Sequence, residues 1–309
     1  MPITKFTNLD FDQIKVQIKD YLRANSNFTD FDFEGSNFSV LIDTLAYNTY
    51  ITAFNSNMTV NESFLDSATL RENVVSLARN IGYVPRSRVA AKAEISFSVT
   101  IADTQTSTLD LEAGLVCVGS SNDTNYVFSV PERIVTTVDS NQNATFSNIT
   151  VHQGTFLEKS FVVDGSLDQR FILDNPYIDS STIVVRIRES NNDVSEGREY
   201  QVSDNILNID TTSEVYFLQE VQDEKYELLF GDGFFGKKLE TGNVIDVSYI
   251  ITDGKEGNGA SNFAFSGRFR DDKGNIEVPT NSIEITTSQN AVNGADIESV
   301  DSIKYFAPR

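Results

Sequence analysis

Cysteine, histidine and tryptophan are nearly or wholly absent from this 309-residue chain. One cysteine, Cys117, and one histidine, His152, exclude a disulfide framework and a Cys/His zinc cluster, because both need several such residues. A Ser/His/Asp or Cys/His mechanism would depend wholly on His152, which has no serine or cysteine motif around it. Cys117 lies in an apolar run that is typical of a buried, inert thiol. We therefore expect no catalytic residue, cofactor or metal site, and no enzymatic activity.

Positive charge and long apolar runs are scarce too. Lys and Arg number 24 against 45 Asp and Glu, which gives a net charge of −21. A surface this acidic repels phosphate backbones and anionic lipids, so neither nucleic acid nor a membrane is an expected partner. The N-terminus has no apolar signal core, and no apolar run approaches the ~20 residues that span a bilayer. We expect a protein that is made in a reducing cytosol.

Two helical patterns open the chain. Residues 10–25 place apolar side chains three and four positions apart, and Asp10 with Gln13 forms a variant of the capping box. After a connector at 26–36, Ser36 or Asn37 can cap a longer helix of about twenty residues. Its apolar stripe consists of Phe38, Leu41, Ile42, Leu45, Ala46, Tyr50, Ala53, Phe54 and Met58.

A further helix is predicted to start near Asn61 or Asp66. Its apolar side chains recur at helical spacing as far as Ile81. Gly82 fits a left-handed helix terminator, and Pro85 ends any continuation. Residues 10–82 therefore offer two or three helices that are joined by short turns.

The period changes to two from Ala93, where apolar and polar side chains alternate as far as Ile101. Short strand signals and turn clusters then continue to about residue 290, which is typical of antiparallel sheets packed as a sandwich or open barrel. The predicted fold class is α+β, with a helical docking region at 1–88 and β-rich domains at 89–176 and 177–290. Residues 291–309 start a further element.

A glycine-rich segment at 230–238, FGDGFFGKK, is the most conspicuous chemical motif, because glycines followed by lysines can hold a phosphate. It lacks the spacing of a P-loop and the change from strand to helix that would aim backbone N–H groups at an anion. We interpret it as a structural turn.

Three sets of motifs carry a family resemblance. The first set is EGS at 34–36, NESFLDSA at 61–68 and ARNIGY at 78–83. The second is LFGDG at 229–233, GNV at 242–244 and GN at 257–258, and the third is GADIES at 294–299 with Ala307-Pro308. In this order they resemble the baseplate J-like proteins of contractile-tailed phages, and the Asn- and Thr-rich composition is most similar to the baseplate wedge subunits of large myophages. Because those subunits continue beyond the Ala-Pro motif, the chain is expected to be a fragment or a truncated form.

The resemblance implies a structural subunit in the tail baseplate of the virion, made in the host cytoplasm. It implies that copies make dimer contacts within a ring around the hub, that the N-terminal helices enter a bundle with other wedge proteins, and that the ring supports the rearrangement that triggers sheath contraction. The long apolar stripe exceeds what a helical hairpin can cover by itself, so a partner helix is its expected cover. The predicted partner-interface residues are Phe11, Ile14, Ile18, Phe38, Leu41, Ile42, Leu45, Tyr50, Phe54 and Met58.

Two alternatives stay open at this stage. A β-sandwich adhesin or glycan-binding module would fit the acidic surface, the Asn and Thr content and the eleven tyrosines, and it predicts a monomer with an aromatic-lined groove. A part of a bacterial contractile injection system would share the architecture and differ only in origin.

Overall fold

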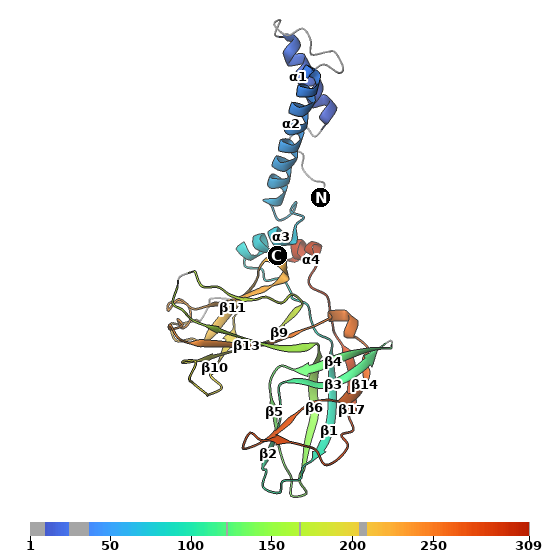
Figure 1. Cartoon of the computed structure of the whole chain (residues 1–309), viewed down its shortest axis with the longest axis vertical. Helices are drawn as coiled ribbons and strands as arrows, with labels where there is room; N and C mark the ends of the chain where they lie inside the picture. The colour runs from blue at the N-terminus through green and yellow to red at the C-terminus, as the bar shows by residue number, and fades with distance from the viewer. Residues whose placement is uncertain (1–9, 25–36, 122, 167, 204–208, 309) are drawn as a thin grey trace. The chain divides into compact units, whose positions relative to one another are not determined.

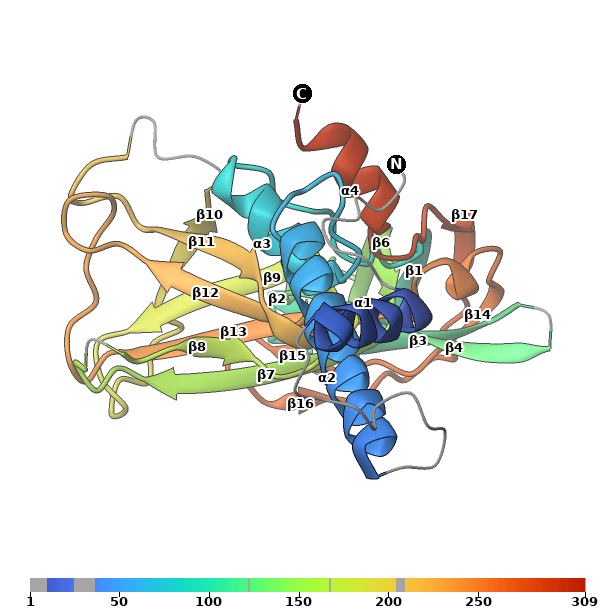
Figure 2. The ribbon, with the colours of Figure 1, turned by 90° about the horizontal axis from the view of Figure 1, so that it is seen from above.

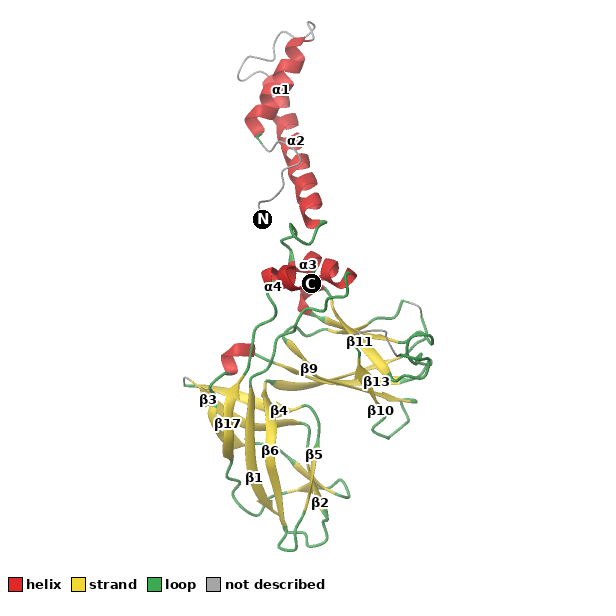
Figure 3. Ribbon diagram, turned by 180° about the vertical axis from the view of Figure 1, so that it is seen from behind, coloured by secondary structure: helices red, strands yellow, loops and turns green. Residues whose placement is uncertain are grey.

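The chain forms two units in the computed structural model, which describes residues 10–24, 37–121, 123–166, 168–203 and 209–308. The helical unit comprises Met1–Tyr83 and Ser299–Arg309, and the β unit comprises Val84–Glu298. Figure 3 shows that α-helices and strands are segregated between the two units, so the predicted α+β class is confirmed. The expected connector at 26–36, with its EGS motif, lies outside the described residues.

The helical unit begins with α1 (Phe11–Ala24) and α2 (Asn37–Glu62). The Asp10 side chain accepts a hydrogen bond from the Gln13 backbone N–H at 3.1 Å, which confirms the predicted cap. Helix α1 packs against the N-terminal half of α2 (Figures 1 and 2). An ion pair of 2.5 Å between Lys15 Nζ and Asp43 Oδ1 joins the two helices.

The second helical pair consists of α3 (Arg71–Asn80) and α4 (Val300–Phe306), which come from opposite ends of the chain. Gly82 ends α3 with a φ of +82°, and the Tyr83 N–H donates to the Ala78 carbonyl at 3.0 Å, so the predicted terminator is confirmed. The small core of this pair contains Ala68, Val74, Val75, Ala78 and Ile303. Among the described helices, none is both long enough and apolar enough to cross a membrane.

The side chain of Glu62, the last residue of α2, holds the start of α3. Its Oε1 accepts hydrogen bonds from the Thr69 N–H at 2.8 Å and the Thr69 hydroxyl at 2.6 Å. Its Oε2 accepts from the Leu70 N–H at 3.2 Å and from Asn73 Nδ2 at 2.8 Å. Leu70, at the cap position of α3, has no side-chain oxygen, so the carboxylate of Glu62 takes over the role of an N-cap.

Two larger sheets and one small sheet make up the β unit (Figure 1). The first sheet has the order β14 (Ser261–Phe265), β3 (Gly114–Ser121), β4 (Thr124–Val130), β6 (Asn143–Gln153), β1 (Lys92–Thr100) and β17 (Thr286–Val292). Backbone hydrogen bonds between Gly259 and Ala291 and between Ala291 and Ala260 bring its two edges together. The small sheet, β16 (Ile276–Glu277), β15 (Phe269–Asp271), β2 (Thr108–Leu111) and β5 (Ile134–Thr137), shares the core of the first.

The second sheet has the order β7 (Thr155–Val162), β13 (Val244–Ile251), β9 (Ile178–Arg188), β10 (Arg198–Val202), β11 (Val215–Glu220), β12 (Tyr226–Phe230) and β8 (Phe171–Leu173). Pairing in it is antiparallel except between β10 and β11. The expected domains 89–176 and 177–290 stay a prediction, but the sheets divide the chain elsewhere. Strands β7 and β8 precede residue 176 and belong to the second sheet, whereas β14 to β17 return to the first sheet and the small sheet. Strand pairing between residues so distant in sequence has no local signal.

A buried polar contact joins the two larger sheets. Gln153, at the end of β6, is 2 % exposed, and its Oε1 accepts from the Thr252 hydroxyl at 2.7 Å and the Asp253 N–H at 3.1 Å. Its Nε2 donates to Asp253 Oδ2 at 2.8 Å. A Cβ added at Gly257 would lie 2.6 Å from Gln153 Cγ, so only glycine fits there. Both ends of the side-chain amide of Gln153 therefore have hydrogen-bond partners within the fold.

Candidate docking surface on the helical unit

The predicted interface residues do not share one environment. Ile14 and Ile42 are buried, at 6 % and 1 % exposure, in the part of the helical unit where α1 covers α2. These two side chains are therefore already covered within the chain. The half-exposed members are Leu41, Leu45, Phe54 and Met58, and the partly buried members are Phe11, Ile18, Phe38 and Tyr50.

The exposed side chains of α2 form a second stripe along the helix. We call it the α2 seam, and it consists of Val40, Thr44, Tyr47, Ile51, Phe54 and Met58. Successive members are alternately four and three residues apart, which is the spacing of the contact positions in a coiled coil. Its apolar members are 37 % to 61 % exposed. The seam lies on a different side of α2 from the buried residues Ile42 and Ala46, so α1 leaves it uncovered.

Sequence reasoning found only the last two seam residues, Phe54 and Met58. The 4-3 spacing of Val40, Tyr47 and Ile51 was the signal that could have identified the others. This spacing is obscured because α2 is apolar on several sides, so that the predicted apolar stripe joins residues of two faces.

The polar side chains of α2 are unusual for an exposed helix. Residues 44–61 contain no charged side chain, although 22 % of the whole chain is charged. Hydroxyls along the helix donate to the carbonyl four residues earlier at 2.7 to 2.9 Å, in the residues Thr44, Thr49, Thr52, Ser56, Thr59 and Ser63. Because these hydroxyls already have partners, the helix can enter a partly apolar environment without leaving them unsatisfied.

The two nucleophile or base candidates have environments that suit packing. Cys117 is buried, and burial raises the pKa of its thiol to about 12, so the reactive thiolate is disfavoured. Burial lowers the pKa of His152 to about 4; nearby Lys92 also lowers it, and Asp179 opposes them. Within the described part of the chain, the buried His152 Nδ1 has no hydrogen-bond partner.

The glycine-rich turn uses its own backbone donors. The Asp232 carboxylate accepts from the N–H groups of Phe235 at 3.0 Å and Phe234 at 2.8 Å, and these bonds lower its pKa. The Gly233 N–H donates to the Gly236 carbonyl at 3.2 Å. The Gly236 N–H donates to the Asp210 carbonyl at 3.0 Å. The amides that a phosphate would need are occupied, and the geometry agrees with a structural turn.

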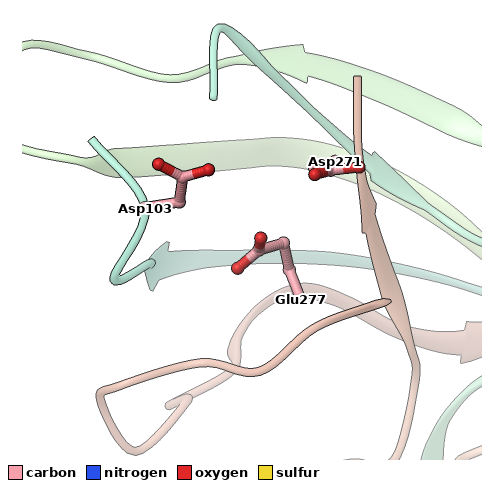
Figure 4. Close-up of side chains that lie close together, drawn as sticks. All are labelled: Asp103, Asp271 and Glu277. Carbon is pink, nitrogen blue, oxygen red and sulfur yellow. The ribbon is translucent and has the colours of Figure 1, made fainter. Parts of the chain in front are cut away.

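Carboxylates of Asp103, Asp271 and Glu277 lie within 4.8 Å of one another at the small sheet (Figure 4). Asp271 is engaged locally: it accepts from Asn275 Nδ2 at 2.8 Å, the Asn275 N–H at 2.6 Å and the Lys273 N–H at 3.0 Å. Burial, followed by the charges of Asp271 and Asp103, raises the pKa of Glu277. Through these hydrogen bonds, the side chain of Asp271 closes the turn between β15 and β16.

Comparison with known proteins gives the class. Residues 10–83, which contain α1, α2 and α3, match the family model described as the helical domain of gp6-like baseplate wedge proteins. The helical region is therefore similar to the helical domain of baseplate wedge proteins, as the sequence motifs predicted. That match supports a location in the tail baseplate of the virion.

A relative extends the match into the β unit. The chain is 30 % identical over 282 residues to the baseplate wedge protein gp6 of Enterobacteria phage T4. The alignment covers 84 % of this chain and 41 % of gp6, so the chain spans about two-fifths of the length of that relative. Both matches support a structural baseplate wedge subunit.

Proposed function

We propose that this chain is a non-enzymatic structural subunit of a baseplate wedge, and that the α2 seam is its docking surface for a helix of another wedge protein. The family match of residues 10–83 and the relative in phage T4 support the baseplate role. The observation that carries the docking role is α2 itself, a 26-residue helix whose exposed side has coiled-coil spacing and whose residues 44–61 have no charge.

The chemistry of the seam defines the kind of partner. An uncharged, partly aromatic stripe is matched by a helix with its own apolar residues at 4-3 spacing, because a charged helix would lose hydration there without gaining an ion pair. Leu41 and Leu45, half exposed on a further side of α2, can contact a second partner helix.

The same proposal extends to assembly. Copies of the chain make dimer contacts within a ring around the hub, and the ring supports the rearrangement that triggers sheath contraction. A bundle of apolar helices suits this role, because such packing has discrete alternative arrangements and transmits displacement without continuous deformation.

The test is a charge placed in the seam. The double variant Ile51→Asp and Phe54→Asp should lose co-purification with the other wedge proteins encoded by the same phage, by at least about tenfold, since an unpaired buried charge costs well over 1.4 kcal/mol. A matched control, Thr49→Asp and Ser56→Asp, adds the same charge at exposed positions on the side of α2 opposite the seam and should co-purify as the natural chain does. Equal helix content by circular dichroism shows that both variants fold.

Co-purification of the seam variant at the natural level would refute docking through the α2 seam and leave the baseplate role standing. A seam variant and a control that both fail would show that charge anywhere on α2 is harmful, which also contradicts a seam. Replacing Leu41 and Leu45 by Asp tests the second contact in the same assay.

A further inference from the structure

A charged groove lies inside the β unit, well away in sequence from the helices. It has a volume of about 430 Å³. One wall is the loop at 131–133, which connects β4 of the first sheet to β5 of the small sheet. The other wall is formed by β7, β9 and β13 of the second sheet and the loop after β9. The groove therefore lies between the loop that follows β4 of the first sheet and the strands of the second sheet.

Two ion pairs bridge the groove, and they have opposite polarity. Glu132 Oε1 of the loop lies 2.5 Å from Arg186 Nη2 on β9. Its neighbour Arg133 reaches Glu196 Oε1, in the loop after β9, with Nη2 at 2.9 Å. The loop thus has an acidic residue followed by a basic one. The opposite wall places a basic residue against the acid and an acidic residue against the base. A shift of the loop by one residue would bring like charges together.

Neighbouring charges support both pairs. Arg133 Nη1 also lies 3.3 Å from Asp110 Oδ2 on β2, and Arg186 Nη2 lies 3.9 Å from Glu199 Oε2 on β10. The four bridging side chains are 32 % to 60 % exposed, so mobile ions reach them. Pairs of this kind are weak individually and sensitive to salt, which makes them suitable for a reversible contact and unsuitable as permanent fasteners.

We propose that Glu132 and Arg133 form a charge-matched latch with Arg186 and Glu196, which holds the loop at 131–133 on the second sheet and opens as ionic strength rises. The latch fixes the separation between the loop at 131–133 and the second sheet across the groove. The packing of Phe156 on β7 against Gly114, whose Cβ would lie 3.4 Å from the Phe156 ring, is apolar and remains when the latch opens.

The test is a cycle of charge swaps in the full chain, each of which leaves the net charge unchanged. The loop swap is Glu132→Arg with Arg133→Glu, the wall swap is Arg186→Glu with Glu196→Arg, and the fourth protein carries both. Spin labels on cysteines that replace Val135 of β5 and Val194 of the loop after β9, both exposed, report the separation across the groove by pulsed electron paramagnetic resonance.

At low salt the natural chain should give a narrow distance distribution and each single-wall swap a longer and broader one. The fourfold variant restores both bridging pairs, but its new carboxylates face Asp110 and Glu199, so its distribution should be narrower than that of either single-wall swap without fully reaching that of the natural chain. Salt at about 1 M, where the screening length is ~3 Å, should give the natural chain the broader distribution as well. One distribution shared by all four proteins at low salt would overturn the latch. If the swapped proteins fail to fold, a salt-independent distribution in the labelled natural chain would overturn it by itself.

Discussion

Replacing Glu62 by Gln should loosen the joint between α2 and α3. The natural carboxylate accepts four hydrogen bonds from Thr69, Leu70 and Asn73, and its negative charge lies at the N-terminus of α3. Glutamine keeps one acceptor oxygen and places an amide donor where Oε1 or Oε2 accepts. The variant therefore loses both the charge and about half of the acceptor capacity.

The magnitude follows from the pKa of Glu62. Burial alone would raise this pKa, but the bonds from Thr69, Asn73 and Leu70 prevail and lower it from 4.5 to about 2. A shift of this size corresponds to about 3 kcal/mol at 1.36 kcal/mol per unit, and solvent screening of a partly exposed carboxylate reduces the usable part to about 1–2 kcal/mol. That range accelerates local opening roughly 5- to 30-fold.

Amide hydrogen exchange at Thr69 and Leu70 is the measurement, because both amides bond directly to the carboxylate. The control is Glu72→Gln, which removes the same charge from the first turn of α3. Exchange at Thr69 and Leu70 should accelerate in Glu62→Gln and change little in the control. Equal acceleration in both variants would show that net charge near α3 matters and the geometry of Glu62 does not.

The effect of pH on this joint has a defined sign. The folded-state pKa of Glu62 is lower than its unfolded value, so its stabilisation is complete above about pH 4.5 and is lost as pH falls toward 2. Protection of Thr69 and Leu70, corrected for intrinsic exchange, should therefore fall between these pH values. The Glu62→Gln variant should lack this dependence, and retaining it would assign the titration to another group.

Three further outcomes are expected. Gln153→Ala should lower the free energy of unfolding by about 2–3 kcal/mol in urea titrations, because the partners Thr252 and Asp253 lose buried hydrogen bonds and a cavity forms; a loss below 0.5 kcal/mol would contradict this. Gly82→Ala should cost about 1–2 kcal/mol by thermal unfolding, since φ is +82° while space for a methyl group exists. Cys117 should react with a thiol reagent at pH 8 only after unfolding, because burial raises its pKa to about 12, and fast labelling of the native chain would refute that burial.

The sequence predicted those elements that depend on residues close to one another in the chain. The cap at Asp10, the terminator at Gly82 and the alternation that became β1 each depend on residues within a few positions of one another. The family motifs added the order of the helical and β regions. These features needed no knowledge of which strands pair.

The division of strands among the sheets could not be predicted in the same way. Strand β17 pairs with β1 across almost two hundred residues, and Lys92 faces Val292 in that register. Both strands have ordinary alternation, and alternation specifies which face is buried but not which partner is chosen. The Gln153 contact between sheets has no motif for the same reason: its partners become neighbours only when β6 and β13 end side by side.

Sequence reasoning identified α2 as the candidate docking helix but did not separate its faces, and the interface residues that it named stay a prediction. A helix that carries charges shows its solvent side directly, but residues 44–61 have none, so several faces were equally apolar. Only the position of α1 separates the covered side, with Ile42 and Ala46, from the α2 seam.

The distribution of charge along the chain supports assembly through this helix. A chain with a net charge of −21 repels its own copies and other acidic proteins, and that repulsion opposes any contact made through carboxylate-rich surface. A contact surface free of charge avoids the repulsion and the cost of burying carboxylates. Helix α2 supplies such a surface over residues 44–61, with its hydroxyls already bonded to its own carbonyls. Its lack of charge, which made its faces hard to distinguish in the sequence, is thus the property that suits it to packing against another helix.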